Sequence, residues 1–118
     1  MTRGLAITLA VAIGFAAEPR AQKPTPAPAA AQVARGRQIY TREKCATCHQ
    51  IAKLGNSRFP LDGVASRLSA DDLRRWMTDT AKMENALPRL PAVRMSAMKY
   101  RLSPADLDAL VSYLKTLK

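Results

Sequence analysis

Three segments of the chain place residues at the i, i+3, i+4, i+7 spacing of one helix face. The first segment ends just before Cys45 and its face consists of Val33, Gly36, Arg37 and Tyr40. The second face consists of Leu73, Trp76, Met77 and Thr80. The third consists of Leu107, Leu110, Val111 and Leu114. No segment alternates strictly between apolar and polar residues, so the pattern predicts an all-α fold with three main helices.

Two of these helices begin at recognisable capping sequences. Ser69 and Asp72 stand at the spacing of a capping box. Ser103, Pro104 and Asp106 combine an N-cap, a proline at the first helical position and an acid in the first turn. Residues 50–68 are rich in turn formers, and residues 84–102 contain two prolines, so we expect two long irregular loops between the helices.

The N-terminus differs from the rest of the chain. Residues 1–17 carry one positive charge and then a short apolar run, which is typical of a secretory signal peptide with cleavage between residues 16 and 21. The run is too short to cross a bilayer as a helix. The alternatives are a buried N-terminal helix and an uncleaved anchor. We therefore expect an exported, periplasmic protein.

Residues 18–32 are rich in proline and alanine and contain no large apolar residue. Such a segment cannot bury enough surface to offset its ordering, so it is expected to be a flexible linker. The folded domain is then residues 33–118. A domain of this size buries only about 60% of its potential surface, and a large apolar cofactor would enlarge its core.

The net charge of the folded domain indicates what kind of partner it binds. Residues 33–118 contain 16 Lys or Arg against 8 Asp or Glu, a net charge of +8. This balance predicts a partner protein with an acidic docking surface. Export argues against a nucleic-acid partner. Contact with a membrane is expected only through partner complexes or an uncleaved signal.

Cys45-Ala46-Thr47-Cys48-His49 is the C-x-x-C-H pattern of covalent haem attachment. Two thiols at this spacing can each add to a vinyl group of one porphyrin, and the adjacent imidazole can bind its iron. A zinc site would need four Cys or His ligands, and the chain has only two cysteines and one histidine. A thioredoxin-like pair would need a βαβ setting. A simple disulfide would not require His49. The motif therefore predicts one haem c.

Because His49 is the only histidine, the sixth iron ligand is a methionine, a lysine or an open position. Met77 lies on a predicted helix face, where packing explains it. Met83 stands at the end of that helix and fits either role. Met95 and Met98 follow two prolines in the second loop, where a thioether could reach the iron and raise its reduction potential.

Residues 33–118 resemble the class I cytochromes c, the small periplasmic type. Gly36 and Tyr40 match the positions at which the family's N-terminal helix crosses its C-terminal helix, and Tyr113 matches an aromatic of the latter. Leu102–Leu117 is similar to the final helix of many bacterial members. The resemblance implies a class I cytochrome c fold, with three main helices and long loops wrapped around one covalently attached haem.

The resemblance also implies roles for individual residues. The Pro60 carbonyl would accept a hydrogen bond from His49. Met95 stands seven residues before Leu102, the usual family spacing, and is preferred to Met98, although Ser96 follows it where the family often has proline.

Two side chains could reach a haem propionate. Trp76 would bond one or serve as simple core, and Arg67 would pair with one or remain solvated. Six basic residues could ring the exposed haem edge: Arg42, Lys44, Lys53, Arg89, Arg94 and Lys99.

The function so implied is one-electron transfer between a dehydrogenase or reductase and an oxidase or other acceptor, by an outer-sphere route through the haem edge. The protein would then be a carrier, not an enzyme, with no small-molecule substrate, or else the cytochrome subunit of a dehydrogenase. The alternative is a haem-based sensor or a small peroxidase with an open sixth position. The lack of a second histidine argues against it.

Overall fold

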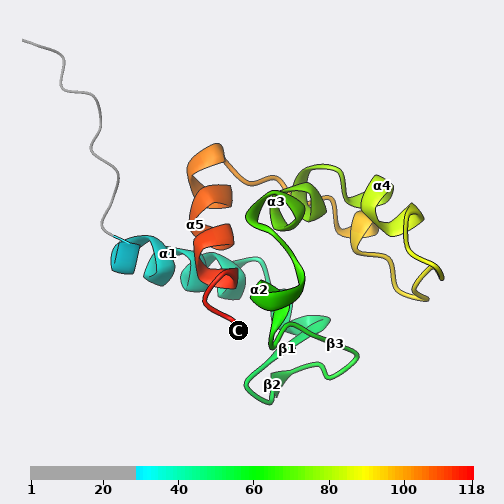
Figure 1. Cartoon of the computed structure of the whole chain (residues 1–118), viewed down its shortest axis with the longest axis horizontal. Coiled ribbons are helices and arrows are strands. Elements are labelled where there is room, and N and C mark those ends of the chain that lie inside the picture. The colour runs from blue at the N-terminus through cyan, green and yellow to red at the C-terminus, as the bar shows by residue number, and fades with distance from the viewer. Residues whose placement is uncertain (1–28) are drawn as a thin grey trace, which may run out of the picture.

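The computed structural model describes residues 29–118 (Figure 1). The expected signal peptide, residues 1–17, and residues 18–28 of the expected linker lie outside the described residues. The last four linker residues, 29–32, are helical instead of extended, because the first helix begins at Ala29. Within the described part of the chain, no helix combines the length and the apolar character needed to cross a membrane.

The domain is mostly helical and contains a small sheet. The elements in order are α1 (Ala29–Arg42), the 3-10 turn η1 (Cys45–Thr47), β1 (His49–Ile51), β2 (Leu54–Gly55), β3 (Phe59–Pro60), α2 (Val64–Arg67), α3 (Ala70–Thr78), α4 (Thr80–Asn85), the 3-10 turn η2 (Met95–Met98) and α5 (Pro104–Leu114). The strand order is β2-β1-β3, with β1 antiparallel to β2 and parallel to β3. The expectation of an all-α domain was therefore incomplete.

The sheet begins with a tight hairpin after β1. Ile51 pairs with Leu54, which leaves a two-residue turn made of Ala52 and Lys53. Both turn residues have positive φ, 49° and 66°, as a type I′ turn requires. Gly55 follows with φ 97°, and a Cβ there would clash with the His49 carbonyl oxygen, so only glycine fits. The segment expected to be one loop therefore has a defined register.

The predicted helix starts are confirmed. Ser69 and Asp72 form a reciprocal capping box at the start of α3, and the Ser103 hydroxyl accepts a hydrogen bond from the Asp106 N–H at the start of α5. The expected second helix is divided, however. α3 ends at Thr78, and after Asp79 the chain begins α4 at Thr80.

The hydrophobic core lies where α5 crosses α1 (Figure 1). The buried apolar residues form one cluster: Ile39, Tyr40, Val64, Leu73, Ala109, Leu110, Val111 and Leu114. At the crossing, a Cβ on Gly36 would clash with the Ala109 carbonyl oxygen. The rings of Tyr40 and Tyr113 pack edge to face beside it, with centroids 5.9 Å apart. The backbones can therefore approach this closely only because residue 36 has no side chain.

We predict that Gly36→Ala destabilises the folded, cofactor-loaded protein. Alanine favours a helix over glycine by about 1 kcal/mol, but overpacking against the Ala109 carbonyl, a backbone group that cannot rotate away, should cost about 2–3 kcal/mol. The net loss should be on the order of 1–2 kcal/mol in the free energy of unfolding, measured by urea titration and far-UV circular dichroism. Ala34→Gly, at an exposed position of the same helix, is the control and should lose about 0.5–1 kcal/mol from propensity alone. A Gly36→Ala protein as stable as the parent would contradict the prediction.

Candidate functional site

The C-x-x-C-H segment joins α1 to the sheet. Cys45 opens the turn η1, and the Cys48 N–H closes it by donating to the Cys45 carbonyl over 3.1 Å. His49 then begins β1. Both thiols are half-buried, and they form no disulfide with each other. Burial raises the pKa of Cys45 to about 11, with smaller contributions from Glu43 and Cys48, so this thiol is neutral at pH 7.

The imidazole of His49 is held in one orientation by the sheet. β1 and β3 pair in parallel with His49 opposite Phe59, and His49 Nδ1 lies 3.0 Å from the Phe59 carbonyl oxygen. A carbonyl can only accept, so Nδ1 carries the proton and Nε2 keeps its lone pair for a metal. Burial lowers the pKa of His49, although the Phe59 contact opposes the shift. The neutral ring that burial favours is the metal-binding form.

The hydrogen bond to His49 was predicted for the wrong carbonyl. The resemblance implied Pro60, but the oxygen that faces Nδ1 belongs to Phe59, one residue earlier, and Pro60 itself is exposed. The register of the parallel pair sets which carbonyl faces the ring, and a residue count cannot supply that register.

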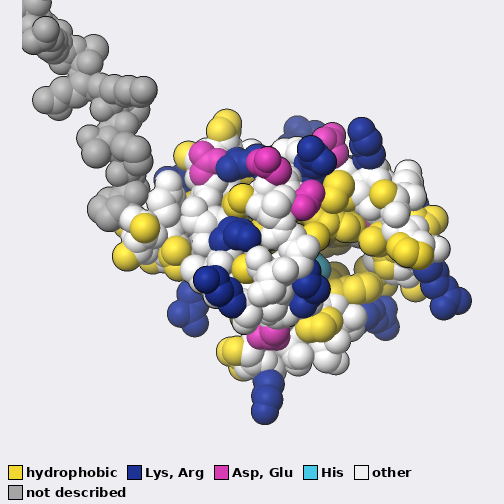
Figure 2. Space-filling view, in the orientation of Figure 1, with side chains coloured by type: hydrophobic (Ala, Val, Ile, Leu, Met, Phe, Trp, Pro, Cys, Tyr) yellow, Lys and Arg dark blue, Asp and Glu magenta, His cyan; other side chains and the backbone are white. Residues whose placement is uncertain are grey.

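A mainly apolar cavity of about 210 Å³ lies beside His49. In Figure 2 the histidine is partly visible in a hollow between hydrophobic side chains. The residues that line the cavity come from the motif, the sheet, α3, α4 and the segment that follows: Cys48, His49, Phe59, Leu68, Leu73, Trp76, Glu84, Leu87, Pro91, Val93, Arg94, Met95, Met98 and Tyr100. A thiol, an imidazole and two thioethers therefore share one apolar cavity.

Most, but not all, of the predicted site residues meet at this cavity. Trp76, Met95 and Met98 line it together with Cys48 and His49, and Cys45 packs against the adjoining core. Pro60 and Arg67 do not line it, and Arg67 donates from Nη1 to the Asp62 carbonyl over 3.0 Å.

The two other methionines that the structure describes do not line the cavity. Met77 packs against the core, as predicted from its helix face. Met83 is half-buried and does not line the cavity.

The cavity suits a large, flat, apolar group that carries a metal. Leu87, Val93 and Met98 line it and are still 39%, 42% and 50% exposed. A cofactor seated there would remove this apolar surface from water. Between residues 29 and 118, no three His, Cys, Asp or Glu side chains converge to hold a free metal ion. The nitrogen and sulfur donors present suit haem iron.

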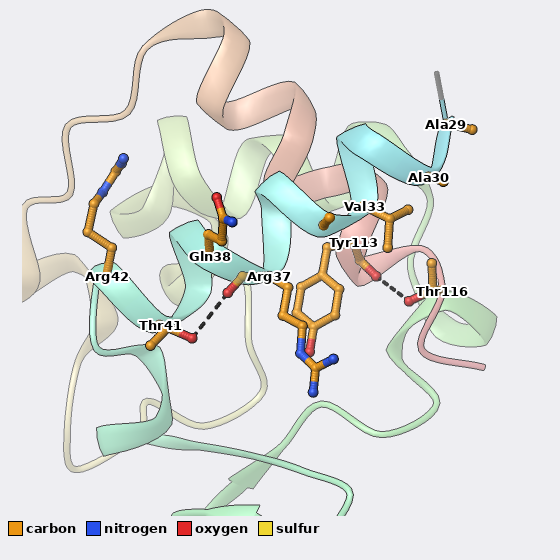
Figure 3. Close-up of a pocket in the computed structure, with 10 residues that line it drawn as sticks. Ala29, Ala30, Val33, Arg37, Gln38, Thr41, Arg42, Tyr113 and Thr116 are labelled. Carbon is orange, nitrogen blue, oxygen red and sulfur yellow. Dashed lines mark hydrogen bonds between the residues drawn. The ribbon is translucent and has the colours of Figure 1, made fainter. Parts of the chain in front are cut away.

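A wider, open groove of about 1110 Å³ lies between the exposed side of α1 and the end of α5 (Figure 3). No residue of the C-x-x-C-H segment lines it. Its threonine hydroxyls donate to their own helical segments, Thr41 to the Arg37 carbonyl and Thr116 to the Tyr113 carbonyl. The groove therefore offers none of the chemistry found beside His49.

Sequence reasoning missed Glu84, which lines the cavity and is only 1% exposed. Helical periodicity carried no signal for it, because an acidic residue near the end of a helix is ordinarily solvated. The one available signal was Ser96, which stands where the resemblance favours proline and donates hydrogen bonds to Glu84.

Comparison with known proteins agrees with this chemistry. The family model described as "Cytochrome c" matches residues 33–118. Neither the curated proteins nor the solved structures yielded a match. From the extent of the family match we conclude that the chain belongs to the cytochrome c family, whose members act with redox partners, and that its cofactor is covalently attached haem c.

Proposed function

We propose that this protein is a class I, single-haem cytochrome c that works in the periplasm as a one-electron carrier, with its iron bound by His49 and Met95. The observation that carries the proposal is the cavity in which the motif and the methionine segment meet. The signal-like residues 1–17 support export. The donor and acceptor would be a dehydrogenase or reductase and an oxidase, or the protein would be the cytochrome subunit of a dehydrogenase.

Each residue at the cavity has a separable task. Cys45 and Cys48 would hold haem c through thioether bonds, and His49 would bind its iron through Nε2. When bound, haem supplies an iron that gains or loses one electron without bonding to a substrate. The Phe59 carbonyl keeps the proton on Nδ1, and the apolar side chains around the cavity exclude water.

Met95 is the preferred sixth ligand for a structural reason as well as for its spacing. Both methionines line the cavity, but Met98 is 50% exposed whereas Met95 is half-buried. The residues on both sides of Met95 are also anchored to Glu84, and no such bond is formed at Met98 among the described residues. A thioether at this position would favour a raised reduction potential.

The alternative, a sensor or peroxidase with an open sixth position, is less well supported. A peroxidase needs an acid–base group with a pKa near the working pH. Glu84 is the carboxylate in the cavity, and although burial raises its pKa, hydrogen bonds from Ser96 and Arg94 lower it to about 2. Glu84 is therefore a poor proton acceptor, and its oxygens are already engaged.

The basic residues expected near the haem edge support a carrier with an acidic partner. Of the six basic residues expected near the haem edge, Arg42 pairs with Glu43 and Asp106, and Arg94 pairs with Glu84. The other four are exposed and, within residues 29–118, have no carboxylate at ion-pair distance: Lys44, Lys53, Arg89 and Lys99. Of the six residues expected near the haem edge, these four are therefore free to meet a partner.

Haem attachment should be covalent and should depend on both thiols. Acid–acetone extraction should leave haem on the parent protein and on Cys45→Ala or Cys48→Ala, each held by one thioether, and should release it from the double variant. Thr47→Ala, between the thiols, is the control and should retain haem. Extraction of haem from the parent protein would refute the proposal.

Met95→Ala should remove the weak absorption band near the red end of the spectrum that ferric iron–thioether bonding gives, and should lower the reduction potential. Met98→Ala is the matched control and should keep the band. Loss of the band in Met98→Ala alone would assign the ligand to Met98. If both variants keep the band, neither methionine is the ligand, and Met83 becomes the next candidate.

Electron transfer to an acidic peroxidase should slow steeply as salt rises. Between about 0.01 M and 0.15 M the Debye length shortens from about 30 Å to about 8 Å, and the second-order rate should fall roughly tenfold or more. Lys99→Gln should weaken this dependence, whereas Lys118→Gln, at the chain terminus, should leave it unchanged. A rate independent of salt would exclude electrostatic steering.

A further inference from the structure

Glu84 is the one charged side chain that the described residues bury completely. It lies in α4, and its carboxylate accepts three hydrogen bonds from the segment around Met95. Ser96 N–H donates to Oε1 over 3.0 Å, Ser96 Oγ donates to Oε2 over 2.6 Å, and Arg94 Nε donates to Oε2 over 2.8 Å. A buried carboxylate is retained only when such donors replace its water.

The three hydrogen bonds to Glu84 come from the two residues that flank Met95. Arg94 and Ser96 are the immediate neighbours of Met95, so Glu84 binds the chain on both sides of the methionine. Arg94 also donates from Nη2 to Asn85 over 3.0 Å, which adds a second link to the end of α4. Movement of the backbone around Met95 away from the cavity would break these bonds and leave a buried charge unpaired.

The rest of the segment has little else to hold it. Leu87, Leu90 and Val93 lie between α4 and η2 and are 39%, 51% and 42% exposed. The buried apolar cluster includes no residue from 80–102, and of that range only Leu102, at its end, packs against the cluster. Among contacts between the described residues, the polar contacts to Glu84 therefore do most to fix the position of this segment, and a seated cofactor would add apolar contacts to Leu87 and Val93.

We infer that Glu84 is a positioning residue that holds Met95 at the iron-binding side of the cavity. The inference rests on the proposed His49–Met95 ligation and adds the interaction that keeps the weak thioether in place. It also explains why Ser96 suits this chain: proline has no N–H, and a proline here would leave Glu84 Oε1 without its backbone donor.

The test measures how readily an added ligand displaces the methionine. In the ferric haem protein, imidazole can bind the iron only when Met95 moves away, so its binding rate reports the opening of this segment. Glu84→Ala should raise the rate roughly tenfold or more, because it removes a buried, charge-assisted set of bonds. Glu84→Gln should have an intermediate effect, since an amide keeps one acceptor oxygen but turns a donor toward donors.

Two further variants separate positioning from general stability. Ser96→Ala removes only the hydroxyl bond, and its effect should be smaller when combined with Glu84→Ala than when made alone. Asp108→Asn is the matched control, because this carboxylate also pairs with an arginine, Arg74, but is exposed and does not line the cavity. It should leave the imidazole rate and the thioether band unchanged.

The outcomes distinguish this inference from the function on which it rests. If the parent protein shows the thioether band and Glu84→Ala and Glu84→Gln bind imidazole no faster than Asp108→Asn, the positioning role is refuted and the ligation stands. If the parent protein lacks the band and binds imidazole freely, the His49–Met95 ligation is refuted, and the role of Glu84 with it.

Discussion

The close crossing of α1 and α5 at Gly36 is the contact on which this small domain depends. All of the large apolar side chains that the described residues bury belong to the cluster around it. The opposite side of the cavity, formed by α4 and the segment to η2, buries one side chain, and that side chain is charged. A domain of this size is marginal without further apolar burial. Its two sides therefore need a large apolar group between them, and covalent haem c supplies one without being lost when the protein opens.

Local signals in the sequence were sufficient for much of this arrangement. The capping residues Ser69 and Ser103 predicted where α3 and α5 begin, because an N-cap acts within a single turn. Gly36 was assigned to the helix crossing through the family resemblance, and the structure gives the steric reason. The C-x-x-C-H spacing predicted the cofactor because the chemistry depends on three residues that are close together in the chain. Such features need no knowledge of distant contacts.

The features that sequence reasoning missed depend on contacts between distant residues or on unusual local choices. The hairpin turn uses Ala52 and Lys53 at positive φ, where asparagine or glycine would have indicated a turn. Its strands are two or three residues long, too short to show alternation. The carbonyl that faces His49 was predicted one residue too late, at Pro60 instead of Phe59, because this contact follows from strand register. Glu84 could not be distinguished from a surface acid, since its burial depends on Ser96, twelve residues away.

Ser96, at a position where the family resemblance favours proline, has a physical consequence for the segment around Met95. Proline would restrict the backbone in the unfolded and folded states alike, and so would limit movement without any partner. Serine leaves the backbone freer but offers an N–H and a hydroxyl, and Glu84 accepts a hydrogen bond from each. In this chain the segment is therefore held by hydrogen bonds to the buried carboxylate of Glu84 in α4, and not by the ring of a proline at position 96. Burial raises the pKa of that carboxylate, but hydrogen bonds from Ser96 and Arg94 outweigh burial and lower the pKa to about 2, so the carboxylate stays ionised. The hold of Glu84 on the segment should therefore be complete above the ordinary pKa of a glutamate and should weaken as the pH falls toward about 2.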